Sequence, residues 1–241
     1  GQLDHGDEDS ALASFTEWTV LEPERPGPWL ARGFAYWQLG QFDNALADFN
    51  TAVKLAGPML TNSLAARGGL LHAMQRSKEA MSDFGEALKL NKADGMIYLF
   101  RGRSLCAEDK YQAGLKDFKT AVQLNAKDAE AHRNLALVLA ACPQSRFRNG
   151  KRAVQSATDA CELTEWNSWT ALDTLAAACA EAGDFAEACR WIQKAADMTD
   201  GANRKQCLAR LKQYQAHQPL RLDWNSLYGS PSAAADAPIS K

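Results

Sequence analysis

Residues 29–55 read WLARGFAYWQLGQFDNALADFNTAVKL, and this stretch decides the fold. Its second half places a small residue, a large apolar residue and another small residue at Ala45, Phe49 and Ala52. The same kind of triplet starts again at Ala80, Gly114, Ala153 and Ala188, and the successive starts are 35, 34, 39 and 35 residues apart. Self-similarity at a period of about 34 residues is typical of a helical solenoid. The sequence therefore predicts an all-α fold that presents an extended surface to binding partners.

The residues around the first triplet resemble those of a known repeat family. Trp29, Gly33, Tyr36 and Gly40 come before Ala45, Phe49, Ala52 and Leu55. This order is similar to the tetratricopeptide repeat. The resemblance extends over about residues 6–200 and implies a right-handed helical solenoid of about five helix-turn-helix repeats. The last two repeats depart from the pattern, because Ala136 and Ala176 replace the first glycine, and Ala157 and Ile192 replace the phenylalanine.

Close packing explains why such a pattern recurs. Two helices cross closely only where their residues are small, and a large side chain next to the crossing fills the remaining space. We therefore expect Phe49, Phe84 and Phe118 to fill equivalent gaps between helices, each beside a glycine or an alanine.

The phase of the repeats predicts the domain organisation. Ala11, Phe15 and Trp18 stand 34 residues before the first triplet, so residues 1–25 are expected to hold only the second helix of a repeat. On this interpretation the chain starts part-way through a longer parent or just after a removed segment. Five repeats follow at residues 26–60, 61–94, 95–128, 129–166 and 167–200. A capping helix over 201–222 and a Gly-, Pro-, Ser- and Ala-rich tail over 223–241 complete the prediction. In the capping helix we expect Leu208, Leu211 and Tyr214 on one face, and Arg204, Lys205, Arg210 and Lys212 on another.

The fourth repeat contains an insertion, the basic loop 142–152. The basic residues of this loop are Arg146, Arg148, Lys151 and Arg152. One hypothesis is contact with an anion or an acidic partner. The alternative is a lengthened turn between helices, closed by Pro143 and Gly150. The segment from Leu135 through Trp191 resembles a tetratricopeptide-repeat block found near the C-termini of large bacterial multidomain proteins. A similar basic loop recurs there without an assigned chemistry, and this resemblance favours the turn.

Composition supports neither nucleic-acid binding nor membrane insertion. The chain has 27 basic and 29 acidic side chains, which give a formal charge of −2. The longest apolar stretch, residues 135–142, is too short to span a bilayer. Residues 1–28 hold seven acids and one base, whereas residues 201–241 hold six bases and two acids. The two ends of the predicted stack are therefore expected to carry opposite charges.

Neither the cysteines nor the carboxylates indicate a catalytic, cofactor or metal site. The six cysteines form no Cys-x-x-Cys pair, and the four histidines show no ligand spacing. We expect the thiols to act as small apolar groups, with Cys179 and Cys189 on facing helices of one repeat. Asp48, Asp83 and Asp117 recur at one repeat position and are interpreted as structural surface charges. Because catalytic motifs are also missing, the sequence predicts a non-catalytic protein with no cofactor and no metal.

The compartment is less well defined by the sequence. Reduced cysteines favour the cytoplasm, whereas earlier removal of a signal segment would place the chain in the periplasm or another compartment.

The family resemblance also implies a binding surface. In tetratricopeptide-repeat domains the first helix of each repeat lines a concave groove, and a peptide partner lies across it. The equivalent positions here are Leu30, Phe34, Trp37, Asn62, His72, Met96, Leu99, Arg103, Arg133 and Asn134. The domains of this family that hold chaperone C-termini place Lys and Asn at set groove positions. Leu30 and Phe34 occupy the first two of those positions, so we expect no chaperone clamp.

Two functions follow from these observations. The first is a scaffold or adaptor that holds a peptide segment or helix of another protein in the groove. The alternative is a structural module that assembles with copies of itself through its ends. In that case Phe15 and Trp18 would supply apolar contact and the opposite charges a salt-sensitive rim, which predicts weak homo-oligomers.

Overall fold

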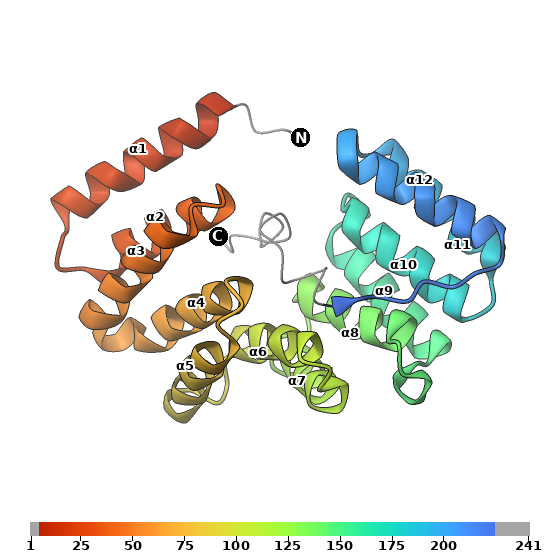
Figure 1. Cartoon of the computed structure of the whole chain (residues 1–241), viewed down its shortest axis with the longest axis horizontal. Helices are drawn as coiled ribbons and strands as arrows, with labels where there is room; N and C mark the ends of the chain where they lie inside the picture. The colour runs from red at the N-terminus through yellow and green to blue at the C-terminus, as the bar shows by residue number, and fades with distance from the viewer. Residues whose placement is uncertain (1–4, 225–241) are drawn as a thin grey trace. The chain divides into compact units, whose positions relative to one another are not determined.

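The computed structural model describes the backbone of residues 5–224 and the side chains of residues 10–224 (Figure 1). All regular structure among these residues is helical, in twelve α-helices and two short 3-10 helices. The predicted all-α solenoid is therefore confirmed. Residues 1–4 and most of the predicted tail, residues 225–241, lie outside the described part of the chain. The described chain divides into two compact units, residues 5–107 with Trp224 and residues 108–223, and each is described by itself below.

The first unit consists of two layers of helices. Its elements are α1 (His5–Leu21), α2 (Pro26–Gln38), α3 (Phe42–Leu55), η1 (Gly57–Met59), α4 (Leu60–Ala73), α5 (Ser77–Leu90) and α6 (Gly95–Ala107). α2 packs on α3, and α4 packs on α5. The neighbours α2, α4 and α6 form one layer, called here the first-helix layer, and α3 and α5 pack against it (Figure 1). α1 packs on α2.

The second unit repeats this arrangement. It contains α7 (Tyr111–Leu124), α8 (Ala129–Ala141), η2 (Ser145–Phe147), α9 (Gly150–Leu163), α10 (Trp169–Glu181), α11 (Phe185–Asp197) and α12 (Gly201–Gln215). α8 packs on α9 and α10 on α11, while α8 also contacts α10 and α12 contacts α11. The first helices of successive pairs are thus neighbours here too.

Local sequence signals fix many of the helix ends. Asp128 caps α8 because its carboxylate accepts hydrogen bonds from the backbone N–H groups of Glu130 and Ala131. Several turns between paired helices contain a left-handed residue, and Gly40 adopts this conformation after α2 with φ +72°. Gln75 adopts the same conformation after α4, with φ +62°, although it has a Cβ atom.

The packing expected of the repeat pattern is confirmed. Phe49, Phe84 and Phe118 are fully buried. A Cβ atom added at Gly33 would lie 2.6 Å from Cε1 of Phe49, and one added at Gly68 would lie 2.8 Å from Cε1 of Phe84. Each glycine therefore lets a phenylalanine ring reach the backbone of the neighbouring helix.

The recurrent aspartates are not surface charges, and that interpretation was wrong. Asp48, Asp83 and Asp117 are 4%, 6% and 4% exposed. A buried carboxylate is costly unless it is paired, and Arg32 pairs with Asp48 while Arg67 pairs with Asp83.

The end of the second unit also differs from the prediction. α12 ends at Gln215, and residues 216–223 do not continue the helix, because His217 is left-handed with φ +56° and Pro219 cannot donate a backbone hydrogen bond. The N–H of Leu222 instead donates to the carbonyl of Ala141 at the end of α8, at 2.9 Å. Leu222 itself is buried.

Arg210 does not lie on the polar outer face predicted for the capping helix. Its guanidinium is buried and pairs with Asp173 of α10. The face of α12 that packs on the unit carries Cys207, Arg210 and Tyr214, spaced three and four residues apart.

The basic loop is tied to the end of α10 through Glu181. Arg148 donates to the carbonyls of Cys142 and Pro143 at 2.8 and 3.1 Å, and to Oε1 of Glu181 at 3.0 Å. Arg221 reaches the other carboxylate oxygen of Glu181 at 2.9 Å. These contacts favour the interpretation of the loop as a lengthened turn, while Arg146, Lys151 and Arg152 remain exposed.

Candidate functional site

An aromatic cluster links α2, α3 and α6 in the first unit. Phe34 and Trp37, one turn apart on α2, stack with ring centroids 6.1 Å apart. Trp37 is 6.4 Å from Phe100 of α6 and meets Phe49 of α3 edge-on at 6.2 Å. Between α2 and α6, Gly69 of α4 leaves room for these rings, since a Cβ atom there would lie 3.0 Å from Trp37 and 3.4 Å from Phe100. Phe34 and Phe100 keep part of their surface accessible.

The first-helix layer contains arginines as its only Asp, Glu, Lys or Arg residues. α2, α4 and α6 contain four arginines and neither an aspartate nor a glutamate. Two of the arginines, Arg32 and Arg67, pair with aspartates of α3 and α5, and these hydrogen bonds raise the pKa of both guanidinium groups. Arg103 of α6 lies with its guanidinium carbon 5.9 Å from the centroid of Phe100. The layer thus combines aromatic rings with arginines and contains no carboxylate of its own.

Eight of the ten predicted groove residues lie on α2, α4 and α6, but their exposure differs. Leu30, Trp37, His72 and Leu99 are buried, Phe34 and Arg103 are half-buried, and Asn62 and Met96 are exposed. The buried members contribute to helix packing: Leu30 and Trp37 belong to the core between α2, α3 and α4. The exposed and half-buried members are the ones whose surface another molecule can reach.

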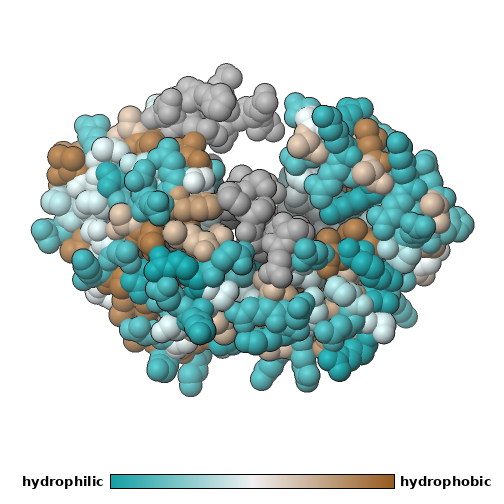
Figure 2. All heavy atoms as spheres, viewed as in Figure 1, coloured by the Kyte–Doolittle hydropathy of each residue, from teal (hydrophilic) through white to brown (hydrophobic). Residues whose placement is uncertain are grey.

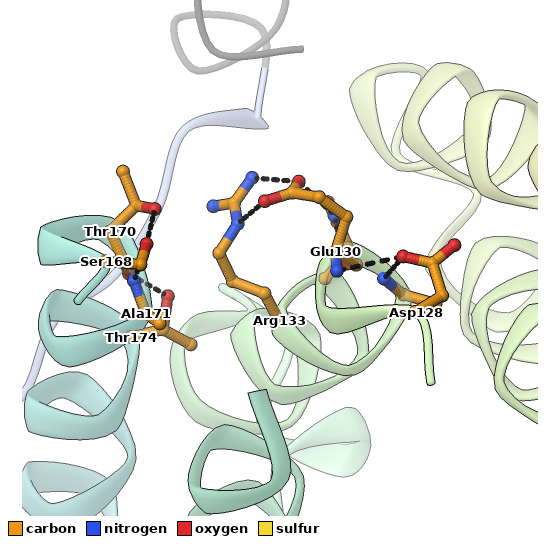
Figure 3. Close-up of polar contacts among 9 residues, drawn as sticks. Asp128, Glu130, Arg133, Ser168, Thr170, Ala171 and Thr174 are labelled. Carbon is orange, nitrogen blue, oxygen red and sulfur yellow. Dashed lines mark hydrogen bonds and ion pairs between the residues drawn. The ribbon is translucent and has the colours of Figure 1, made fainter. Parts of the chain in front are cut away.

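The other two predicted residues lie on α8 in the second unit. Arg133 donates from Nε and Nη2 to the carboxylate of Glu130 at 2.9 and 2.8 Å (Figure 3). Asn134 is fully buried, and its amide donates to the backbone carbonyl of Glu130 at 2.7 Å. Arg133 is therefore held by its own helix.

Figure 3 draws, together with the Arg133–Glu130 pair of α8, three hydroxyl-bearing residues: Ser168, which caps the start of α10, and Thr170 and Thr174 of α10. The hydroxyls of Ser168 and Thr170 lie 2.9 Å apart, and Thr174 donates to the carbonyl of Thr170 at 2.9 Å. Thr174 is buried, whereas Ser168, Thr170 and the Arg133–Glu130 pair keep part of their surface accessible and are polar, in contrast to the aromatic residues of the first-helix layer.

Sequence reasoning missed the buried pair between Asp173 and Arg210. Burial alone would lower the pKa of Arg210, but attraction to Asp173 and the hydrogen bond between them outweigh it and raise the pKa. Burial raises the pKa of the Tyr214 hydroxyl, because it disfavours the charged phenolate. Its hydroxyl and Oδ1 of Asp173 are buried without a hydrogen-bond partner among the described residues. No local sequence motif predicts this pair, because Asp173 and Arg210 are 37 residues apart.

A surface cluster of tryptophans was also missed. Trp166, before α10, stacks on Trp191 of α11 with ring centroids 5.1 Å apart. Arg190 covers Trp191 at 4.2 Å, and Lys194 lies 5.8 Å from Trp166. The stacking of Trp166 on Trp191 holds the turn between α9 and α10 against α11.

An open depression lies among α3, α4 and α5. It is lined by Leu46, Asn50, Arg67, Leu71, Arg76, Glu79, Ser82 and Asp83. Arg67 pairs with Asp83, and Arg76 pairs with Glu79. Because its four charged groups pair with each other, the depression offers little binding energy to a charged ligand.

The six cysteines are all free thiols, and only Cys189 is not buried. Burial raises the pKa of Cys161 to about 12 and that of Cys179 to about 11. A reactive or metal-binding cysteine needs the opposite shift, toward the thiolate. Among the described residues no group of three or more His, Cys, Asp or Glu side chains is arranged to hold a metal ion. In the same part of the chain, no helix has the length and apolar character needed to cross a membrane.

Comparisons with known proteins agree with the repeat pattern. Residues 26–57 match the family described as "Tetratricopeptide repeat". No curated protein matches the sequence of the chain. Among solved structures, yeast Tom70 is similar with a TM-score of 0.67 and 18% identity, over 85% of this chain and 43% of Tom70. This chain therefore spans less than half the length of that protein.

Two further structures show how widely the fold is used. YrrB, described as a tetratricopeptide-repeat protein with an unusual peptide-binding site, has a TM-score of 0.53 and 20% identity over 84% of this chain and 100% of its own. A monomeric mutant of IFIT1 with m7Gppp-AAAA has a TM-score of 0.72 and 17% identity over 88% of this chain and 52% of its own. At these identities the likeness concerns the fold alone. Residues 26–57 thus match one tetratricopeptide repeat, and the described chain shares its helical solenoid fold with the solved tetratricopeptide-repeat protein YrrB.

Proposed function

We propose that the chain is a non-catalytic scaffold or adaptor, and that its first-helix layer binds a peptide segment or helix of another protein. The observation that carries this proposal is the composition of α2, α4 and α6, which combine accessible aromatic surface with positive charge and no carboxylate. Aromatic, methionine and arginine side chains are enriched at the centres of protein interfaces. The peptide-binding site named for YrrB supports the same use of this fold.

The domain organisation belongs to this proposal. We retain the five repeats at 26–60, 61–94, 95–128, 129–166 and 167–200, preceded by a half-repeat. In this scheme α1 is the second helix of the half-repeat. The division into two units falls inside the third repeat, between its two helices α6 and α7.

The predicted groove residues divide into contacts and supports. We propose Asn62, Met96, Phe34 and Arg103 as contacts on the first-helix layer, because part or all of each side chain is accessible. Arg133 lies outside this layer, on α8 of the second unit, where it pairs with Glu130. The buried residues Leu30, Trp37, His72, Leu99 and Asn134 hold the helices that carry them.

Selection from a random peptide library tests the proposal. A double variant with Asn62→Asp and Met96→Asp places two carboxylates on the first-helix layer. Asn44→Asp with Leu90→Asp is the matched control, because Asn44 and Leu90 are exposed on α3 and α5. Peptides selected on the parent chain should bind the control as before and the first double variant at least about tenfold more weakly. Failure of the parent chain to select any peptide would disprove the proposed function.

A second function is favoured by exposed apolar residues on α1. Trp18, Val20 and Leu21 are 39%, 74% and 71% exposed, and apolar residues are also visible on the viewed face of the first unit (Figure 2). These side chains would drive self-association through α1. The alternative function, assembly of the chain with copies of itself, therefore remains open to a direct test.

A further inference from the structure

We infer that the C-terminal ends of α8 and α10 form a docking site for an extended segment that carries a basic side chain between two leucines. Residues 219–223, called here the strap, occupy this site, and another segment of the same pattern can displace them. The strap and both helix ends belong to the second unit, so this site is separate from the first-helix layer of the proposed function.

The strap is an extended segment whose side chains alternate. Residues 219–223 form neither helix nor strand, and Figure 1 shows this part of the chain running from α12 back toward α8. Leu220 and Leu222 are buried, whereas Arg221 and Asp223 are exposed. Successive side chains of an extended chain point in opposite directions. The strap therefore buries its leucines and keeps its charged side chains at the surface.

The end of α8 supplies a backbone acceptor. The last carbonyl groups of a helix have no partner within the helix. The N–H of Asn149 donates to the carbonyl of Leu139 at 2.8 Å, and the N–H of Leu222 donates to the carbonyl of Ala141 at 2.9 Å. The loop that follows α8 thus satisfies one carbonyl, whereas the other depends on the strap. Any extended segment offers such an N–H, so this contact alone requires no particular side chain.

The end of α10 supplies a carboxylate. Glu181 is the last residue of α10, where a negative charge is unfavourable beside the negative end of the helix dipole. One of its oxygens lies 3.0 Å from Nε of Arg148, and the other lies 2.9 Å from Nη1 of Arg221. The side chain of Arg148 is 16% exposed and that of Arg221 is 37% exposed. Arg148 is therefore a fixed part of the site, and the second oxygen selects a basic side chain from the docked segment.

The strap is held by contacts that are individually weak. A backbone hydrogen bond and a partly exposed ion pair each add little stability, because both compete with water. Segments without regular structure open at a lower free energy than the helices around them. The turn before the strap is fixed separately, since the amide of Gln213 donates to the carbonyl of Pro219 at 3.2 Å and His217 stacks on Phe185 at 4.7 Å. We therefore expect the strap to open while α12 stays folded.

A synthetic peptide of residues 216–223, AHQPLRLD, tests docking from outside the chain. It is added to the isotopically labelled full chain and to a full-length strapless variant, in which glycine and serine replace residues 219–223. Chemical-shift changes in NMR spectra measure binding. The peptide should bind the strapless variant at least about tenfold more tightly than the parent, because in the parent the strap competes at a high effective concentration. No binding to the strapless variant, or equal binding to both proteins, would overturn the proposal.

Variants locate the bound peptide. In the strapless chain Glu181→Gln should weaken binding severalfold, and so should Arg221→Gln in the peptide. The two changes together should weaken binding no more than either alone, because both remove the same ion pair. Glu162→Gln, at an exposed position of α9, is the matched control and should leave binding unchanged. Fully additive losses would show that the peptide binds elsewhere and would overturn the site.

Hydrogen exchange in the parent chain tests displacement even if circular dichroism shows that the strapless variant does not fold. The amide of Leu222 should exchange slowly, because it is bonded to the carbonyl of Ala141. An excess of the unlabelled peptide should speed this exchange severalfold by displacing the strap. A peptide with aspartate in place of both leucines should leave the exchange unchanged. If the leucine peptide also leaves the exchange at Leu222 unchanged, the strap is not displaceable and the proposal fails.

Discussion

Arg32 of α2 donates from Nε and Nη2 to the two carboxylate oxygens of Asp48 in α3, each at 2.8 Å. Its remaining Nη1 donates to the hydroxyl of Thr19 in α1 at 3.1 Å, so one guanidinium joins three helices. Arg67 repeats the arrangement 35 residues later with Asp83. Charged forks of this geometry are strong and directional. The two pairs therefore join α2 to α3 and α4 to α5 at the same position of successive repeats.

This relationship predicts the effect of deleting one carboxylate. Asp48→Ala leaves Arg32 largely buried without its partner, and should lower the free energy of unfolding by about 3–5 kcal/mol. The measurement is urea denaturation followed by circular dichroism. Asp43→Ala is the control, because Asp43 is exposed in the same helix, and it should cost less than about 0.5 kcal/mol. Equal effects of the two substitutions would show that the buried pair adds no stability.

The glycine–phenylalanine contacts predict a pattern of loss and rescue. Phe49→Ala, Phe84→Ala and Phe118→Ala should each lower the free energy of unfolding by about 3–5 kcal/mol, because each leaves a cavity in a fully buried site. Gly33→Ala should cost about 1–3 kcal/mol by overpacking, since its methyl group would meet the ring of Phe49 at 2.6 Å.

The rescue follows from a pair that the chain itself contains. Ala176 and Ile192 stand sixteen residues apart, as Gly33 and Phe49 do, and both are fully buried. Combining Gly33→Ala with Phe49→Ile should therefore be less destabilising than the sum of the two single changes, as measured in a double-mutant cycle. If the losses of the two single variants simply add, the larger residue at position 33 does not compensate for the smaller one at position 49.

The buried thiols predict a loss of stability in alkali. An unfolded thiol ionises near its ordinary pKa of 9.0, whereas folded Cys161 and Cys179 ionise at about 12 and about 11. Between these values the folded protein retains protons that the unfolded chain has lost, so the free energy of unfolding falls as pH rises above about 9. Urea midpoints measured from about pH 8 upward should show this decline. In a Cys161→Ala, Cys179→Ala variant the free energy of unfolding should fall less steeply with pH. An equally steep fall would contradict the attribution of this loss to the two buried thiols.

The contacts of α12 predict opposite effects for two neighbouring groups. Arg210→Met leaves Asp173 buried without its partner and should cost about 3–5 kcal/mol. Tyr214→Phe removes a hydroxyl that is buried without a partner among the described residues, and should be neutral or stabilising. Thermal unfolding compares the variants. A large loss in Tyr214→Phe would mean that the hydroxyl has a bonding partner in solution.

The exposed apolar end of α1 predicts weak self-association. Sedimentation across a concentration series should detect dimers or oligomers that persist in high salt, because apolar contact is not screened. Val20→Lys with Leu21→Lys should yield a monomer. Leu90→Lys with Leu124→Lys is the matched control, since these leucines are 54% and 41% exposed on α5 and α7. A monomeric parent chain at high concentration and low salt would exclude this function.

The sequence by itself determined the repeat and its packing rule. The period of about 34 residues and the Gly33–Phe49 spacing are local properties, because each repeat carries the small and large residues that meet when its own two helices pair. For the same reason the helix type and the burial of Phe84 and Phe118 followed from the pattern. The aspartates show the limit even within a repeat: the sixteen-residue spacing of Arg32 and Asp48 was visible, but burial decided that they are internal pairs rather than surface charges.

Only the tertiary structure decided which candidate site residues are accessible. Trp37 and Met96 both stand at groove positions of the repeat, yet one is 5% and the other 42% exposed. The difference arises because Phe49 and Phe100 come from other helices to pack against Trp37. The pairing of Arg210 with Asp173 likewise depends on how α12 packs on the unit. Such contacts depend on which residues other helices bring to the same place, and a repeat pattern specifies the helices without specifying those neighbours.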